Sequence, residues 1–143
     1  MNKTDKVLKQ GWVKELLAEP LLARLGTANP ATAQPHVTPV WFAWDGECIY
    51  ISAFISTRKA REVSSNPHIS VLIDVDNPTR AVLMEGKAEV ITESGAVSRW
   101  SEIIYTRYVG EKDVMRDPYQ SWVHDTENRI IKLRPEHVYA WKW

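Results

Sequence analysis

Two β-rich segments on either side of Asp45-Gly46 constrain the fold of this chain more than any other feature of its sequence. Residues 36–44 and 47–53 are rich in β-branched and aromatic side chains, and two such runs around Asp-Gly are a strong local signal for a β-hairpin. Pro39 lies inside the first run and cannot donate a ladder hydrogen bond, so we expect it at a sheet edge or a bulge. The hairpin therefore predicts an antiparallel sheet.

The rest of the chain alternates between strand and helix patterns. Strands are expected where apolar runs lie between turn residues, and helices where apolar residues recur every three or four positions. The expected strands are 21–28, 68–75, 80–92, 129–133 and 138–143, and the expected helices are 5–19, 56–65, 93–108 and a short one near 119–123. Gly86 lies in the middle of a strand, which predicts a bulge or a close backbone approach. We expect a single α+β domain over residues 1–143, mainly antiparallel and barrel-like, with about seven strands and three to four helices.

The charge and composition of the chain exclude several classes of partner and site. Lysine plus arginine and aspartate plus glutamate both number 18, whereas nucleic acids and anionic membranes attract clustered positive charge. Cys48 is the only cysteine, which excludes an internal disulfide and a cysteine-rich zinc site, and the histidines lack a metal-binding spacing. No apolar run is long enough to span a membrane, and no apolar leader follows Met1. We expect a cytoplasmic protein without a metal, a membrane or a nucleic acid as partner.

Tryptophan is unusually frequent in this chain, with seven residues against two phenylalanines. Its side chain combines a large apolar surface with an N–H group that needs a partner. The excess therefore indicates a ligand platform or a subunit interface. Tryptophans that simply fill the core are the alternative, and the sequence leaves it open.

The strongest candidate for a ligand site is residues 56–59 (STRK), at the expected start of a helix. Free N–H groups and the positive end of the helix dipole attract anions there. Arg58 adds a planar fork that can bind two oxygens, and Lys59 adds a compact charge. This combination favours a phosphate site. The alternative is a helix with a solvated basic first turn, in which Arg61 pairs only with Glu62 or water.

The backbone of residues 38–42 is a second candidate. A strand interrupted by proline leaves N–H and C=O groups outside the ladder, and these could bind the edge of a planar heterocycle. The alternative is an ordinary strand in which Trp41 and Phe42 belong to the core.

These segments together resemble the pyridoxamine 5′-phosphate oxidase superfamily. Residues 56–71 (STRKAREVSSNPHISV) are similar to its Ser-Arg-Lys-Ala…Asn-Pro…Val-Ser signature, and residues 80–90 (RAVLMEGKAEV) to its central strand. Residues 24–27 (RLGT) and 35–42 (PHVTPVWF) resemble the first two strands of its small flavin-binding members. The resemblance covers about residues 15–95, in the right order and spacing. It implies a split β-barrel that binds FMN in a groove between two subunits.

The resemblance also implies which residues bind the cofactor phosphate. Arg58 and Lys59 would hold the phosphate, and Thr57 would donate a hydroxyl. Relatives that use the deazaflavin F420 have a similar Lys-x-Arg pattern, which Lys59-Ala60-Arg61 also matches. The phosphate site therefore fits FMN or F420.

The flavin ring would be bound by residues of the two hairpin segments. In the resemblance, Thr38, Val40 and Trp41 flank the isoalloxazine ring, while Ser52 and Ala53 lie along the cofactor. These assignments rest on the family pattern and not on spacing alone.

Two departures from the family pattern limit what the resemblance implies. Arg80 and Ala81 lie where the family often reaches the cofactor from its central strands, but Ala81 replaces a polar residue common in the true oxidases. True pyridoxamine 5′-phosphate oxidases are also longer and end with an Arg-x-His substrate motif, whereas residues 139–143 read YAWKW. Oxidation of vitamin B6 is therefore not implied.

The function expected from the resemblance is a flavin-dependent oxidoreductase. It would pass a hydride or electrons between FMN, or F420, and a small organic substrate. The alternative is a flavin or haem carrier without turnover. A haem carrier would need an axial histidine, for which His124 and His137 are the candidates.

We also expect a homodimer with the cofactor at its interface. Four tryptophans lie outside the matched cofactor strands and are the candidates for the subunit seam: Trp100, Trp122, Trp141 and Trp143. Tryptophan is enriched in interface cores, and a two-fold interface is the commonest closed assembly. A loop at 109–127 of the second chain would cover the flavin ring.

Overall fold

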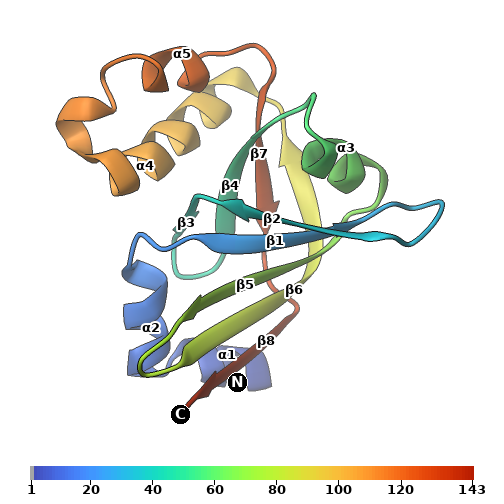
Figure 1. Cartoon of the computed structure of the whole chain (residues 1–143), viewed down its shortest axis with the longest axis vertical. Helices are drawn as coiled ribbons and strands as arrows, with labels where there is room; N and C mark the ends of the chain where they lie inside the picture. The colour runs from blue at the N-terminus through green and yellow to red at the C-terminus, as the bar shows by residue number, and fades with distance from the viewer. Residues whose placement is uncertain (1) are drawn as a thin grey trace.

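The computed structural model, which describes residues 2–143, folds as one strongly curved antiparallel sheet of eight strands accompanied by five helices (Figure 1). The strands are β1 (Ala23–Ala28), β2 (Pro35–Val40), β3 (Phe42–Trp44), β4 (Ile49–Phe54), β5 (His68–Val75), β6 (Arg80–Ile91), β7 (Asn128–Leu133) and β8 (His137–Lys142). The helices are α1 (Lys3–Leu8), α2 (Gly11–Ala18), α3 (Arg58–Ser65), α4 (Ser94–Asp113) and α5 (Tyr119–Val123).

The sheet curls because one strand belongs to two halves of it. The strand order is β2-β1-β5-β6-β7-β4-β3, with β8 also paired to β6. Residues 80–87 of β6 pair with β5 and residues 88–91 pair with β7. β2 and β3 stand at opposite ends of the strand order, yet Trp41 alone separates them in the chain. The two ends must therefore approach each other, which makes the sheet a split barrel.

The inside of the curled sheet holds the main apolar core. Leu25, Ile51 and Met84 are fully buried on their strands, as expected where alternate residues face inward. α2 adds Leu16 and Leu17 from a single helical face. Each such side chain stabilises the fold by about 1.5–3 kcal/mol when it is fully buried.

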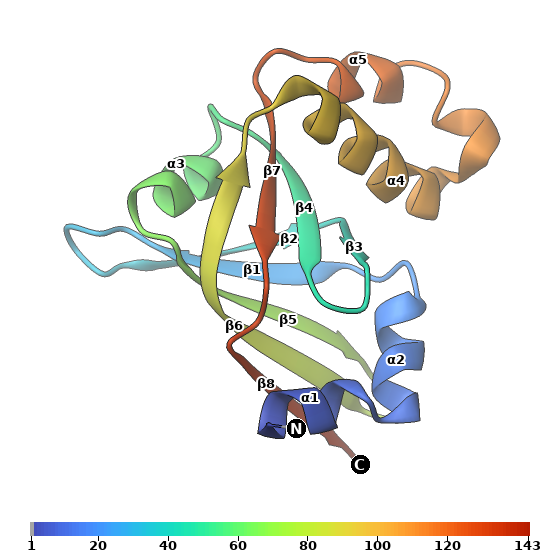
Figure 2. The same cartoon turned by 180° about the vertical axis from the view of Figure 1, so that it is seen from behind.

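A second core lies on the other side of β4 and β7, beneath α4. Tyr50 and Ile130 on the strands pack with Val97, Ile104 and Val123 from the two C-terminal helices. Figure 2 shows α4 and α5 as a layer across the upper end of β4 and β7. This layer matters for the site because it brings helical aromatic residues close to the junction between β2 and β3.

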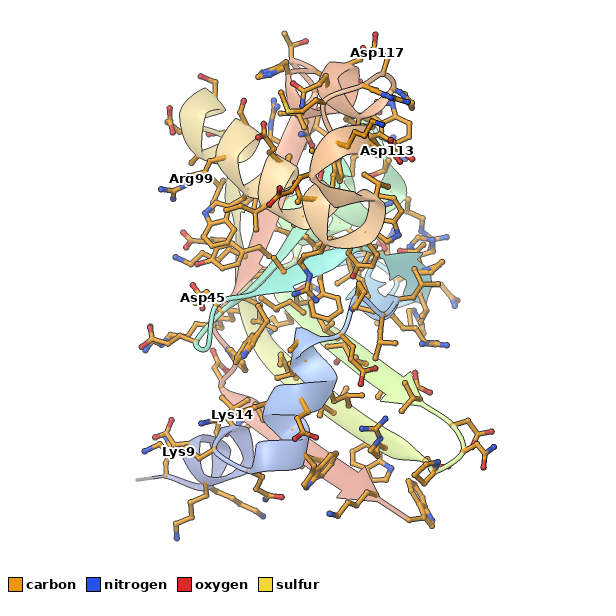
Figure 3. The ribbon with its side chains drawn as sticks, turned by 90° about the vertical axis from the view of Figure 1, so that its left-hand side faces the viewer. Lys9, Lys14, Asp45, Arg99, Asp113 and Asp117 are labelled. Atoms are coloured by element: carbon orange, nitrogen blue, oxygen red, sulfur yellow. The ribbon has the colours of Figure 1, made fainter. Side chains whose placement is uncertain are left out.

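The first helix ties the start of the chain to its last strand. The Thr4 hydroxyl donates to the carbonyl oxygen of Glu136 at 3.2 Å and accepts from the Val138 amide at 3.2 Å. Figure 3 shows Lys9 and Lys14 at this lower end, and Asp113 and Asp117 in the helical layer at the other end. Among residues 2–143, no helix is long and apolar enough to cross a membrane.

The structure confirms the expected fold class, a mainly antiparallel α+β split β-barrel. In residues 2–143 there are five helices rather than the three or four expected. The expected helix 5–19 is divided into α1 and α2 around residues 9–10. The expected helix 93–108 is followed by a kink at Gly110, where φ is 89°, and by a short helical piece that ends at Asp113. Part of the segment expected as loop at 109–127 is therefore helical.

Two local expectations about strand residues are confirmed, and one is modified. Pro39 lies on β2, an edge strand. Gly86 approaches another backbone closely, because an added Cβ would lie 3.1 Å from both the Glu136 amide nitrogen and Leu133 Cδ1. The expected hairpin exists, but only β3 pairs with β4. β2 ends at Val40 and pairs with β1 instead.

Candidate functional site

The start of α3 carries no side-chain cap. Thr57 occupies the N-cap position, but its hydroxyl donates to the carbonyl oxygen of Phe54 at 2.7 Å and does not cap the helix. The first N–H groups of a helix have no partner within it. The first turn of α3 therefore presents amide donors and the positive end of the helix dipole to an incoming anion.

The two adjacent cations at this helix start face different hollows. Lys59 lines a pocket toward α4 and α5, and burial lowers the pKa of its amino group. Arg58 lines a second hollow with Arg61 and Glu62, and its Nε donates to Glu62 Oε2 at 3.2 Å. Arg61 donates from Nη1 to the carbonyl oxygen of Ser56 at 2.7 Å. Arg58, not Arg61, is thus the partner of Glu62.

The pocket beside Lys59, which we call the aromatic pocket, has a volume of about 390 Å³. Its lining consists of Leu22, Pro39, Val40, Trp41, Ser52, Lys59, Tyr105, Tyr119 and Trp122. Four of the ten residues expected at the cofactor site are therefore brought together: Val40, Trp41, Ser52 and Lys59. The volume and the mostly apolar lining with a few polar groups are typical of a small-molecule site.

Trp41 is held in place by aromatic side chains of α4 and α5. Its ring stacks on Tyr108 at a centroid distance of 4.6 Å and an angle of 3°, and meets Tyr105 edge-on at 5.9 Å. Tyr119 lies 6.4 Å from Trp41 and packs edge-on against Trp122 at 5.5 Å. Such pairs contribute about 0.5–1.5 kcal/mol each beyond the buried area. The result is a rigid aromatic wall.

The Tyr108 hydroxyl also fixes the backbone next to Trp41. It donates to the carbonyl oxygen of Leu21 at 2.6 Å and accepts from the amide of Phe42 at 3.1 Å. Helix α4 is therefore joined directly to the β2–β3 junction that forms the pocket.

A chain of hydrogen bonds forms the polar side of the aromatic pocket. The Ser52 hydroxyl donates to Asn128 Oδ1 at 2.9 Å and lies 2.9 Å from the Tyr105 hydroxyl. Because the serine hydrogen is used on Asn128, Tyr105 is the donor to Ser52. Asn128 in turn donates to the Ser101 hydroxyl at 2.8 Å. Burial raises the pKa of Tyr105, so its phenol stays protonated at neutral pH.

Two further residues expected at the site have buried polar atoms that lack partners. Thr38 Oγ1 on β2 and Arg80 Nε at the start of β6 make no hydrogen bond within residues 2–143. Buried polar groups of this kind are normally satisfied. Their orphan state fits a site that a ligand or another chain completes.

The remaining expected residues lie outside the aromatic pocket. Ala53 is buried in the main core beside Ser52. Arg80 and Ala81 lie where β6 pairs with both β5 and β8, and neither lines the pocket. Their expected contact with a cofactor stays a prediction.

The aromatic pocket contains three aromatic residues that the sequence did not single out as cofactor-site candidates: Tyr105, Tyr119 and Trp122. Trp122, a candidate for the subunit seam, lines the aromatic pocket, and its place at a seam stays a prediction. A signal was present in the spacing, because Tyr105 and Tyr108, like Tyr119 and Trp122, are three residues apart and share a helix face. The sequence could not show that both faces meet Trp41.

The other tryptophans expected at the seam differ in their surroundings. Trp100 stacks on Tyr50 of the same chain at 3.6 Å and 8°, so it covers the second core. Trp141 and Trp143 remain exposed, by 39% and 73%.

The cysteine and histidines lie away from the pocket. Cys48 is buried, which raises the pKa of its thiol, as expected for a small core residue rather than a nucleophile. His124 and His137 line two other hollows. No group of three or more histidine, cysteine or acidic side chains is arranged to hold a metal ion within the described part of the chain.

Comparisons with known proteins identify similar folds. A family model described as pyridoxamine 5′-phosphate oxidase matches residues 11–142. A conserved hypothetical protein from Mycobacterium tuberculosis is 23% identical with a TM-score of 0.77, covering 94% of this chain and 84% of the other. An F420 reductase is 27% identical with a TM-score of 0.72, covering 88% and 94%. A haem storage protein from Vibrio cholerae is 17% identical with a TM-score of 0.74, covering 93% and 94%. Curated proteins gave no significant match.

Proposed function

Because the chain belongs to the pyridoxamine 5′-phosphate oxidase family, we propose that it binds FMN and acts as an oxidoreductase on a small organic substrate. Structural neighbours of the chain differ in cofactor and role, so the proposal rests on the residues of the candidate site. FMN bound there would supply the hydride or electron transfer. The chain would bind the phosphate, orient the ring and exclude water.

The observation that carries this proposal is the position of Lys59, at an uncapped helix start and in the wall of the aromatic pocket. Burial lowers the pKa of Lys59, and no carboxylate among the described residues offsets that cost. A phosphate dianion would supply the missing counter-charge and accept hydrogen bonds from the free amide groups at the start of α3. Phosphate and ring sites would then be continuous.

The β2–β3 junction supports binding of the flavin ring. Trp41 belongs to neither strand ladder, and Thr38 Oγ1 is a buried polar atom without a partner. A planar heterocycle presents donors and acceptors along its edge, and its faces pack well on aromatic walls. These residues fit an isoalloxazine ring.

F420 is the second candidate cofactor. It is favoured by the similarity to an F420 reductase, at 27% identity over 88% of this chain. Haem has less support, since no histidine is found among the residues that line the aromatic pocket. His124 and His137 belong to other hollows.

The proposal further includes a homodimer built on the outer face of the sheet. The strand registers place Val37, Gly26, Ser70, Glu85 and His137 in one row across β2, β1, β5, β6 and β8, with their side chains on the same face. The same face carries Tyr139 and Trp141, and Val37 is 65% exposed. Exposed apolar groups on one face are typical of an interface.

A binding titration tests the cofactor. Apo-protein is titrated with FMN while the quenching of flavin fluorescence is followed, and we expect low-micromolar affinity or better. F420 is titrated in parallel. Failure of FMN to bind at tens of micromolar, with tight binding of F420, would replace FMN by the second candidate. Failure of both would refute the proposed function.

Light scattering tests the dimer. We expect a mass of twice 16.4 kDa for the unmodified protein, and a monomer for Val37→Arg, because the arginine would be buried at the interface. Met115→Arg is the matched control, since Met115 is 61% exposed and lies outside the sheet. A monomeric unmodified protein with bound cofactor would refute this part.

A further inference from the structure

A buried carboxylate lies beneath the proposed phosphate site. Glu62 on α3 is only 6% exposed. Its Oε1 accepts from the Thr27 hydroxyl at 2.7 Å, and its Oε2 accepts from Arg58 Nε at 3.2 Å. His36 Nδ1 lies 3.9 Å from Oε1 and has no hydrogen-bond partner in residues 2–143. The carboxylate thus connects α3 with β1.

A negative charge at this position is unexpected next to a site for a phosphate. The hydrogen bond from Thr27 lowers the pKa of Glu62, as does the contact with Arg58, although burial opposes both. The group is therefore ionised at neutral pH. An ionised carboxylate weakens binding of a nearby anion through Coulomb repulsion, so its presence calls for a compensating role.

The geometry of Arg58 suggests that role. A guanidinium group has five N–H donors in a rigid plane. Glu62 takes the Nε edge, and the two terminal nitrogens remain available on the opposite edge. The side chain of Arg58 is 47% exposed and lines the second hollow beside Arg61, so an anion can reach its guanidinium group from solvent. A guanidinium group that is already held by a hydrogen bond loses less side-chain entropy on binding a phosphate than one that moves freely.

We propose that Glu62 is a positioning residue that fixes the Nε edge of Arg58, so that its two terminal nitrogens bind the phosphate of the cofactor. This inference rests on the proposed function, because it assumes a phosphate-bearing cofactor. It adds a residue that the cofactor does not touch. The hydrogen bond, more than the charge of Glu62, is what the proposal requires.

Two alternatives make different predictions. If Glu62 acts only as a negative charge, its removal strengthens phosphate binding. If Glu62 only ties α3 to β1, its removal weakens binding of every ligand and lowers the melting temperature. Positioning of Arg58 instead predicts a loss that is restricted to ligands with a phosphate group.

The first experiment compares FMN with riboflavin, which lacks the phosphate. Glu62→Leu should weaken FMN binding about tenfold, close to the loss of one charge-assisted hydrogen bond, and leave riboflavin binding unchanged. Glu62→Gln keeps an acceptor for Arg58 Nε, and its amide can donate to Thr27 and to the unpartnered His36 nitrogen. It should bind FMN within about threefold of the unmodified protein. Glu15→Gln, on the exposed face of α2, is the charge control.

The second experiment is a double-mutant cycle with Arg58→Ala. If Glu62 acts through Arg58, Glu62→Leu causes no further loss of FMN affinity in the Arg58→Ala background. Independent roles would instead give additive losses. Arg58→Lys is a test that leaves the buried residues intact. A lysine cannot bond Glu62 and present a fork at once, so we expect it to bind FMN about tenfold more weakly.

The results separate this inference from the proposed function. If the unmodified protein binds FMN no better than riboflavin, the phosphate site itself is wrong, and so is the inference. If FMN does bind better, the inference is overturned by any of three results. These are an unchanged or stronger affinity in Glu62→Leu, an equal loss for riboflavin, or full FMN affinity in Arg58→Lys.

Discussion

Replacing Lys59 with methionine tests the phosphate site most directly. Methionine keeps the length and the apolar stem of the side chain but removes its charge. Lys59 lines the aromatic pocket at the uncapped start of α3, where the phosphate of FMN would be its counter-ion. We expect Lys59→Met to weaken FMN binding and to leave riboflavin binding unchanged.

The size of the effect follows from the contact that is lost. A hydrogen bond to a charged group contributes about 1.5–3 kcal/mol, which corresponds to a loss of about tenfold to a hundredfold in affinity. Burial is the cause of the lowered pKa of Lys59, so water screens this contact less than it would on an open surface. We therefore expect the upper half of the range.

The same substitution should have the opposite effect on the apo-protein. Because burial lowers the pKa of Lys59, the folded state disfavours its charged form. The cost is present at neutral pH and disappears as the pH rises through the lowered pKa toward the ordinary value for lysine. Lys59→Met removes this cost, so the apo-protein should melt at the same temperature or higher.

Fluorescence titrations and thermal melts measure both effects on one preparation. Lys14→Met on the exposed face of α2 is the matched control, since Lys14 (Figure 3) does not line the aromatic pocket. An equal loss of FMN and riboflavin, together with a lower melting temperature, would show that Lys59 supports the fold rather than the phosphate.

The remaining predictions concern the pocket wall, a close backbone contact and an acid-sensitive turn. Trp41→Ala should weaken FMN and riboflavin equally in the same titration, because it removes the wall and not the phosphate contact. Tyr105→Phe should lower the free energy of unfolding in urea by about 1 kcal/mol, since Ser52 loses a donor. Gly86→Ala should lower it by about 1–3 kcal/mol, because the added Cβ would press on Glu136 and Leu133. Burial would raise the pKa of Asp45, but hydrogen bonds from two backbone amides and Tyr50 keep it below its ordinary value. The hydrogen bonds to ionised Asp45 therefore stabilise the folded state above the ordinary aspartate pKa, and this contribution is lost as the pH falls through the lowered pKa of Asp45. In Asp45→Asn, the free energy of unfolding in urea should fall less over that acidic range than in the unmodified protein.

The fold could be predicted largely because its signals are local. Asp45-Gly46 marks the hairpin turn, and the apolar run at residues 68–75 became β5 with the expected bounds. The division of the first helix at residues 9–10 was missed, because the apolar spacing continues across it. The separate α1 is joined through Thr4 to Glu136 and Val138, more than a hundred residues away in the sequence, and no local pattern predicts that contact.

The site was predicted less completely for the same reason. Lys59 was named from the basic helix start as well as from the family pattern, and Ser52 from the family pattern alone. The structure places both in the aromatic pocket. Arg58 follows Thr57 and precedes Lys59 in the sequence, yet successive helical residues point about 100° apart, so it faces another hollow. Tyr105 was missed because its partners lie far away in the sequence: Ser52 on β4 and Trp41 at the β2–β3 junction.

Trp41, the single residue between the two edge strands, has a mechanical consequence. β2 and β3 are not paired with each other, but Trp41 joins them in the chain, so a movement of one strand shifts the end of the other through this residue. Tyr108 of α4 and Tyr119 of α5 pack against Trp41 and restrict that movement. A molecule seated against Trp41 would therefore brace both edges of the barrel at once. The amide hydrogens of β2 and β3 should then slow their exchange with solvent together when the pocket is filled, although no hydrogen bond joins the two strands.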